Sequence, residues 1–361
     1  MNSTTFQTLA PVPFRLPKAP AFLLLFVLAV LSAHAADPKT PEEHFDAAIV
    51  LLKADEPRDL DGAMEHLRAA ADNNYRSAQR VLGKLYLDRF ENTGAPEDGE
   101  QARQWIEKAA DSGDPPAQEY LGEMYETGRG LTQDLNAAIA WYRKSADAGN
   151  RRAQFALALA YYGGHGVEKD TTEALCWFES AAAQGHSGAQ IVLGGMYRDG
   201  IGVARDYPAA LHWFLQAAAQ GDPDALANLG YMYQHGLGIP ADEEEANWLF
   251  RQAAALGSAE GHIKLAGNFL VEKDIPQALV HIEEAAGQEH MTAQYMMGTT
   301  YESQDYGRVD LAQARVWYEK SATQGYATAQ YALGALYYRG DPGAGVEPEF
   351  APAVLWFQMA D

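Results

Sequence analysis

The sequence predicts an all-α fold, a right-handed α/α solenoid of about eight helix-loop-helix units with a 36-residue period. Three observations lead to this prediction. Leucines recur 36 residues apart along the middle of the chain, tryptophans follow them at the same period, and glycine closes most units. Self-similarity at a period of 20 to 50 residues is the mark of a stacked repeat array, in which no unit buries its apolar face alone.

The N-terminus has the pattern of an export signal. Arg15 and Lys18 precede an apolar run at residues 21–31, and Ala33 and Ala35 supply small residues where a signal peptidase reads the chain. The run is shorter than the ~20 residues that a membrane-spanning helix needs. We therefore expect residues 1–35 to be a signal peptide cleaved after Ala35, a periplasmic or secreted protein, and no integral membrane segment after cleavage.

Charge and cysteine content exclude several classes of function. Removal of residues 1–35 leaves 25 Lys and Arg against 49 Asp and Glu, a net charge of −24. Nucleic acid would repel such a chain, so no nucleic-acid partner is expected. Cys176 is the single cysteine, so no disulfide can form within the chain. Because Cys176 precedes Trp177 in a predicted helix, we expect a buried, inert thiol.

The first helix of each unit carries a Leu and, four residues later, a Tyr or Phe. Ala-Gln opens six of these helices. The recurring leucines and methionine are Leu82, Leu121, Leu157, Leu193, Leu229, Leu265, Met297 and Leu333. The aromatic residues are Tyr86, Tyr125, Tyr161, Tyr197, Tyr233, Phe269, Tyr301 and Tyr337. Spacings of three and four place these residues on one helical face, which we expect to be core.

The second helix of each unit carries a Trp with Ala three residues before it. The tryptophans are Trp105, Trp141, Trp177, Trp213, Trp317 and Trp356, and Leu249 and His281 take the same place in two further units. We expect this Trp ladder to be core as well. The histidines, such as His165, His212, His235 and His281, are not expected to recur at a common repeat position or at ligand spacing, so no metal site and no cofactor is expected.

Residues at the helix ends agree with this organisation. Asp134, Asp170, Asp206 and Asp242 stand where an N-cap is needed, and glycines such as Gly185 stand eight residues past a Trp, where a cap needs positive φ. In four units the interhelical loop reads Gly-x-Gly-aliphatic, as from Gly200 to Val203. No strand precedes these glycines and no Lys-Ser/Thr follows, so a tight connection is expected instead of a phosphate loop.

These residues together resemble the Sel-1-like repeats, relatives of the tetratricopeptide repeats. Residues 189–221 show the pattern Ala-Gln-x-x-Leu-Gly-x-x-Tyr, then Gly-x-Gly-aliphatic, then Ala-x-x-Trp-aromatic and Ala-x-x-Gly. The resemblance covers residues 75–361, and residues 36–74 are expected to form a linker and a degenerate first hairpin. It implies a right-handed solenoid whose first helices line a concave groove.

The groove positions vary from unit to unit, and we take them as the candidate ligand-binding stripe. They lie two, six and nine residues past the opening Ala of each unit. Binding patches favour Tyr and Arg anchors, although packing of these side chains within the solenoid is an equally open alternative. The predicted residues are Phe155, Tyr162, Ile191, Arg198, Tyr231, Gln234, Tyr295, Tyr331 and Tyr338.

No catalytic residue is predicted, because His-Glu-x-x-His, Gly-x-Ser-x-Gly, Cys-x-x-Cys and Walker sequences are all missing from the chain. The leading hypothesis is an exported, non-catalytic scaffold for protein–protein interaction in envelope assembly, secretion or host interaction, as the resemblance implies. The alternative is a carbohydrate or cell-wall glycan binder that uses the groove. A hydrolase of the β-lactamase-like branch is disfavoured, because the resemblance implies a cysteine pair in each repeat of that branch.

Overall fold

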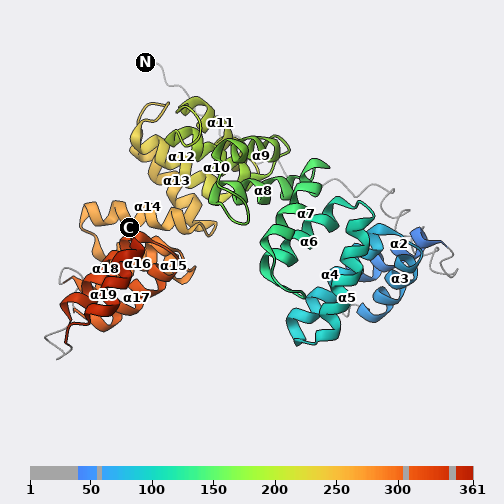
Figure 1. Ribbon diagram of the computed structural model, residues 1–361. Coiled ribbons are helices and arrows are strands. Elements are labelled where there is room, and N and C mark those ends of the chain that lie inside the picture. Colours follow the sequence, from blue (N-terminus) through green and yellow to red (C-terminus); the bar gives the residue numbers. More distant parts are fainter. Residues whose placement is uncertain (1–39, 55–58, 304–308, 341–346, 361) are drawn as a thin grey trace, which may run out of the picture. The chain divides into compact units, whose positions relative to one another are not determined.

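The computed structural model describes residues 40–54, 59–303, 309–340 and 347–360, which contain eighteen helices and no strand. This confirms the predicted all-α solenoid of helical repeats. The predicted signal peptide lies outside the described residues. The chain divides into two compact units, residues 1–109 and residues 110–361, and each is described by itself (Figure 1).

The first unit contains α2, α3, α4 and most of α5. The helices are α2 (Pro41–Lys53), α3 (Leu60–Asp72), α4 (Arg76–Thr93) and α5 (Pro96–Asp111). Helices α2 and α3 pack as a hairpin, and α3 also packs on α4. Thr40 caps α2 in a full capping box with Glu43, so the first described helix has a defined start.

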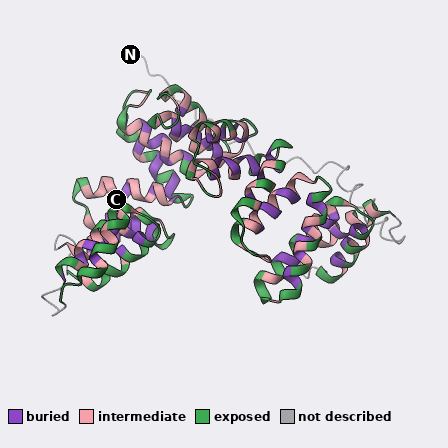
Figure 2. Ribbon diagram, viewed as in Figure 1, coloured by how far each residue is buried: buried purple, intermediate pink, exposed green. Residues whose placement is uncertain are grey.

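The second unit consists of seven hairpins. Their helices are α6 (Pro115–Thr127), α7 (Leu135–Asp147), α8 (Arg151–Gly163), α9 (Thr171–Ala183), α10 (Ser187–Asp199), α11 (Tyr207–Ala218), α12 (Pro223–His235), α13 (Glu243–Ala255), α14 (Ala259–Glu272), α15 (Ile275–Gly287), α16 (Met291–Glu302), α17 (Leu311–Thr323), α18 (Ala327–Arg339) and α19 (Phe350–Ala360). Each even-numbered helix packs on the next odd-numbered helix, and each odd-numbered helix packs on the first helix of the following hairpin. Buried residues accordingly lie between neighbouring helices, while the outer faces are exposed (Figure 2).

The helix caps form as predicted. The carboxylates of Asp134, Asp170, Asp206 and Asp242 accept from backbone N–H groups in the first turns of α7, α9, α11 and α13. The backbone N–H of each of these residues donates in turn to the carbonyl of the recurring Tyr, as Asp206 does to Tyr197 at 2.9 Å. Gly185 has φ +78°, which a side chain would strain, and it ends its hairpin as expected.

The Trp ladder is not the centre of the core, which corrects one expectation. Trp213 is half-buried, and the next residue, Phe214, has 0% of its surface exposed. The reason lies in the facing helix, where a Cβ at Gly194 would stand 2.6 Å from the Phe214 ring. The absence of a Cβ lets Phe214 occupy the space between α10 and α11, and the larger indole is left at the edge.

Cys176 corrects a second expectation, because its side chain is exposed and not buried. It occupies the outer face of α9, while Ala174 and Phe178 on the same helix are buried. The apolar residues beside Cys176 in the sequence therefore led to a wrong prediction of its burial.

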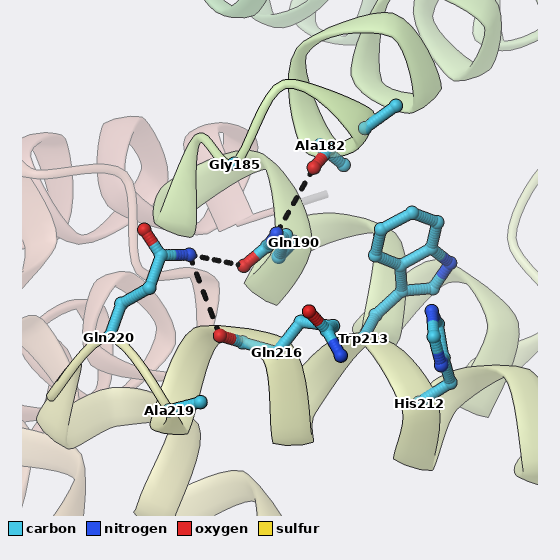
Figure 3. A pocket seen from close by; sticks show the side chains of 9 residues that line it. Ala182, Gly185, Gln190, His212, Trp213, Gln216, Ala219 and Gln220 are labelled. Carbon is cyan, nitrogen blue, oxygen red and sulfur yellow. Dashed lines mark hydrogen bonds between the residues drawn. The ribbon is translucent and has the colours of Figure 1, made fainter.

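Side-chain amides connect neighbouring repeats. Gln190 donates through Nε2 to the Ala182 carbonyl of the preceding hairpin at 3.0 Å and accepts from Gln220 of its own hairpin at 2.8 Å (Figure 3). The same Gln–Gln bond joins Gln154 to Gln184 at 2.7 Å and Gln294 to Gln324 at 2.8 Å. The Gln of the Ala-Gln pair thus satisfies a buried carbonyl at the hairpin boundary.

Candidate functional site

The predicted stripe lies on the first helices of the hairpins in the second unit, and the structure separates its residues into three groups. Phe155 and Tyr162 lie on α8, Ile191 and Arg198 on α10, Tyr231 and Gln234 on α12, Tyr295 on α16, and Tyr331 and Tyr338 on α18. One group packs on aromatic residues of its own and the following hairpin, one pair is largely exposed, and one cluster joins three hairpins.

The first group consists of half-buried residues that pack against the core. The rings of Phe155 and Tyr162 lie 5.9 and 6.2 Å from the ring of Phe178 in the second helix of their hairpin. Ile191 packs in the same way against the cluster around Phe214, and Tyr295 lies 5.6 Å from Tyr318. For these residues, packing explains the apolar character of the stripe.

The second group is the exposed pair on α18. Tyr331 and Tyr338 have 63% and 60% of their surface exposed. Among the described residues, their ring contacts lie within the last hairpin, at 5.3 Å from Phe357 and 5.5 Å from Phe350. These two tyrosines are accessible to a partner.

The third group forms a cluster across three successive hairpins. The guanidinium of Arg198 on α10 lies 5.1 Å from the ring centroid of Tyr231 on α12, and the ammonium of Lys264 on α14 lies 5.0 Å from the same ring. Together with Asn228 and Glu260 they line a pocket of about 230 Å³. We call this set the Tyr231 cluster.

Fixed hydrogen bonds orient the Tyr231 cluster. Arg198 donates to the Asn228 side-chain oxygen at 2.8 Å and forms a two-pronged ion pair with Asp199. The hydrogen bond from Arg198 lowers the pKa of the Asp199 carboxyl, and the same bond raises the pKa of Arg198. Lys264 pairs with Glu260 at 2.8 Å. Each cation is therefore paired with a carboxylate, which suits binding of a mixed polar surface better than chemistry.

Gln234 extends the cluster along the stripe. Its amide donates to the Asn268 side-chain oxygen at 2.9 Å, and Asn268 donates to Asn247 at 2.8 Å. Gln234 is thus oriented by an amide chain that crosses from α12 to α14 and back to α13.

The predicted stripe missed Asn228 and Lys264. Both stand three residues past the opening place of their units, at Ala225 and Gly261, and not at two, six or nine. That position borders the stripe on the helix surface, so a wider helical face would have included both residues.

Histidines do recur at common repeat positions, contrary to the expectation from the sequence. His262 and His281 approach within 2.9 Å through their Nδ1 atoms, and His44 and His66 do so within 3.0 Å. In each pair, one His takes the Gln place of the first helix and the other takes the Trp place of the second. Over the described ranges, no group of three or more His, Cys, Asp or Glu is arranged to hold a metal ion.

None of the helices that the structure describes has the length and apolar character needed to cross a membrane.

Comparison with known proteins identifies the repeat. The Sel1 repeat model matches nine segments, residues 52–75, 76–114, 115–150, 151–186, 187–222, 223–258, 261–290, 292–326 and 327–360. The count is one more than the eight expected, because the segment before residue 76 is also matched as a repeat. A search of curated proteins found no match.

Two solved structures illustrate the likeness. The crystal structure of c5321, a protective antigen present in uropathogenic Escherichia coli strains displaying an SLR fold, is 34% identical with a TM-score of 0.55. The match covers 82% of this chain and 63% of c5321, so the chain spans less than two thirds of that protein. A Sel1 repeat protein from Oxalobacter formigenes is 27% identical over 77% of this chain and 96% of that one, with a TM-score of 0.46.

Proposed function

Because the chain belongs to the Sel1 repeat family, whose repeats mediate protein–protein interaction, we propose that it is an exported, non-catalytic scaffold that binds a protein partner through the Tyr231 cluster. In this proposal the protein is exported to the periplasm or the medium, and it serves in envelope assembly, secretion or host interaction.

The observation that carries this proposal is the convergence of side chains from three hairpins on one tyrosine. Arg198, Tyr231 and Lys264 come from α10, α12 and α14, and each is only partly exposed. Tyr and Arg held in place by neighbours are the residues that contribute most at protein interfaces, because little side-chain entropy is lost when they bind. Helix surfaces of stacked repeats commonly present such extended binding faces.

Export is supported by the sequence of residues 1–35 and by the character of one relative. Ala33 and Ala35 follow the apolar run at the spacing of a cleavage site. The relative c5321 is a protective antigen, and an antigen that protects is one that the host's immune system meets. N-terminal sequencing of the protein from its native envelope or medium should return Ala36 as the first residue, and Met1 would contradict cleavage.

The experiment that tests the binding role is affinity capture with the full chain from the envelope fraction of the source cells. Each captured protein is then titrated, as a purified protein, against the wild type, Arg198→Gln and Tyr231→Ala. We expect a loss of about tenfold or more in affinity for each variant, the size typical of interface anchors.

Tyr331→Ala is the matched control, because it removes an exposed tyrosine of the same stripe from a different hairpin. It should leave the affinity within about twofold. Equal affinity in all four proteins, with unchanged thermal stability, would place the partner elsewhere and overturn the proposal.

A further inference from the structure

A lysine covers the Trp ring in several repeats. Lys144 lies three residues after Trp141, and its ammonium stands 3.6 Å from the ring centroid. Lys320 covers Trp317 in the same way at 4.2 Å, and Lys108 covers Trp105 at 5.2 Å. A lysine one turn along the helix thus closes the outer face of the indole through a cation–π contact.

Trp213 has a different neighbour at this place. The residue three positions after Trp213 is Gln216, which has no charge to hold it over the ring. A pocket of about 420 Å³ lies here, between the second helices of two successive hairpins (Figure 3). Its floor is made of small residues, Ala182, Ala183, Gly185 and Ala219. The volume is in the range of small-ligand sites.

The polar groups around this pocket are amides, an imidazole and the indole. The lining residues are Gln190, His212, Trp213, Gln216 and Gln220, and the described residues that line the pocket include no Asp, Glu, Lys or Arg. Gln190 already forms the two hydrogen bonds described above, to the Ala182 carbonyl and with Gln220. The side-chain amide of Gln216 makes no hydrogen bond within the described part of the chain, so it offers one donor group and one acceptor.

Trp213 also lacks the intrahelical acceptor that its counterpart in the preceding repeat has. In the preceding repeat, the carboxylate of Glu173, four residues before Trp177, accepts from that indole at 3.0 Å. The residue four positions before Trp213 is Ala209, which has no acceptor in its side chain. An indole without an intrahelical acceptor and a free amide therefore line one uncharged pocket.

We propose that the Trp213 pocket binds a neutral saccharide unit. The C–H face of a sugar ring packs on the indole, and its hydroxyl groups, which both donate and accept, bond to the side-chain amide of Gln216. A pocket without ionic side chains gives a charged ligand no counter-charge, and the net charge of −22 repels an acidic glycan. The site lies on the second helices and is separate from the Tyr231 cluster on the first helices.

The test uses the full chain and three soluble trisaccharides as probes: maltotriose, N-acetylated chitotriose and trigalacturonate. Ligand-observed saturation-transfer NMR, followed by titration, measures the binding of each. We expect saturable binding of at least one of the two neutral probes at concentrations up to about 10 mM, and weaker binding of the acidic probe.

Gln216→Lys is the decisive variant, because it introduces at Trp213 the lysine that covers Trp141 in its own repeat. Its affinity for the neutral probe should fall by about tenfold or more. Gln252→Lys is the matched control: it adds the same charge at the same helical place one repeat on, where Leu249 stands in place of Trp. It should bind within about twofold of wild type.

Three results would overturn the proposal. These are no saturable binding of either neutral probe, tighter binding of trigalacturonate, and equal binding by wild type and Gln216→Lys. A short peptide that binds wild type and loses affinity for Gln216→Lys, while both neutral sugars fail to bind, would assign the pocket to a protein partner instead. None of these results bears on the Tyr231 cluster, whose variants are tested separately.

Discussion

The Nδ1 atoms of His262 and His281 lie 2.9 Å apart, so one neutral ring donates its Nδ1 proton and the other accepts it. These residues occupy two repeat positions, the Gln place of the first helix and the Trp place of the second, and the residues at these positions covary along the chain. Six repeats have Gln and Trp there, as Gln190 and Trp213 do, one has Leu226 and Leu249, and two have His in both. The residues at the two positions therefore change together from repeat to repeat, which indicates that the choice of one side chain depends on the other.

The His262–His281 pair predicts a pH-dependent stability. Burial and the neighbouring His262 hold the pKa of His281 below its ordinary value of 6.5. The unfolded chain then takes up a proton before the folded chain does, so this contribution to stability is complete above pH ~6.5 and is lost as the pH falls below it. Urea midpoints at pH 7.5 and 5.5 should show a smaller decrease for His262→Gln/His281→Trp than for wild type.

That double variant introduces the residues of the following repeat, Gln294 and Trp317, so it removes the imidazoles and keeps a pair the fold accepts. An identical decrease of the midpoint in both proteins would show that protonation of this pair does not contribute.

The second prediction concerns the two adjacent aromatic residues of α11. Phe214→Ala should lower the free energy of unfolding by about 3 to 5 kcal/mol, the cost of emptying a fully buried phenyl ring. Trp213→Leu should cost less, on the order of 1 kcal/mol, because Trp213 is half-buried and Leu249 fills the same place one repeat on. Chemical denaturation measures both, and a larger loss for Trp213→Leu would reverse the assignment of the core position.

Two neighbouring glycines of α10 give a third, internally controlled prediction. A Cβ at Gly194 would stand 2.6 Å from the Phe214 ring, whereas a Cβ at Gly195 meets nothing within 4 Å. Gly194→Ala should destabilise by about 1 to 3 kcal/mol through overpacking. Gly195→Ala should stabilise by about 0.5 to 1 kcal/mol, because Ala favours a helix interior. Equal effects in denaturant unfolding would mean that the close approach of α10 and α11 does not matter.

The fourth prediction concerns Cys176. Its exposed side chain should react with a disulfide reagent such as DTNB in native buffer, releasing one equivalent of thiolate per chain. Cys176→Ser serves as the blank. A reaction that appears only after urea is added would show that the thiol is buried, as the sequence predicted.

Local signals were read correctly from the sequence. Asp206 as an N-cap and Gly185 at positive φ each depend on a few neighbouring residues, so their places follow from spacing alone. The choice between Trp213 and Phe214 does not, because both recur at the same period and only the facing Gly194 decides which ring is enclosed. The Sel1 pattern indicates that both positions are important for the fold, but it does not indicate how deeply each side chain is buried.

The candidate site was only partly predictable for a related reason. Arg198 and Tyr231 were found because they vary on a helical face, but Phe155 varies on the same face and packs on Phe178. Variation from unit to unit does not distinguish a binding residue from a core residue that adjusts to its own hairpin. The Trp213 pocket was missed because its signal is a lysine that several other repeats have three residues after the Trp and that this repeat lacks.

The amide bonds between hairpins have an evolutionary consequence. Gln154 reaches the Ala146 carbonyl as Gln190 reaches that of Ala182. Deletion of residues 151–186 would therefore bring Gln190 against Ala146, where the partner it needs is already present. A gene for such a protein can gain or lose whole 36-residue units by recombination and keep the Gln–carbonyl bond at the boundaries of repeats that begin with Ala-Gln. Loss of a single helix would instead leave two unmatched faces, so change in length is expected to come in steps of one hairpin.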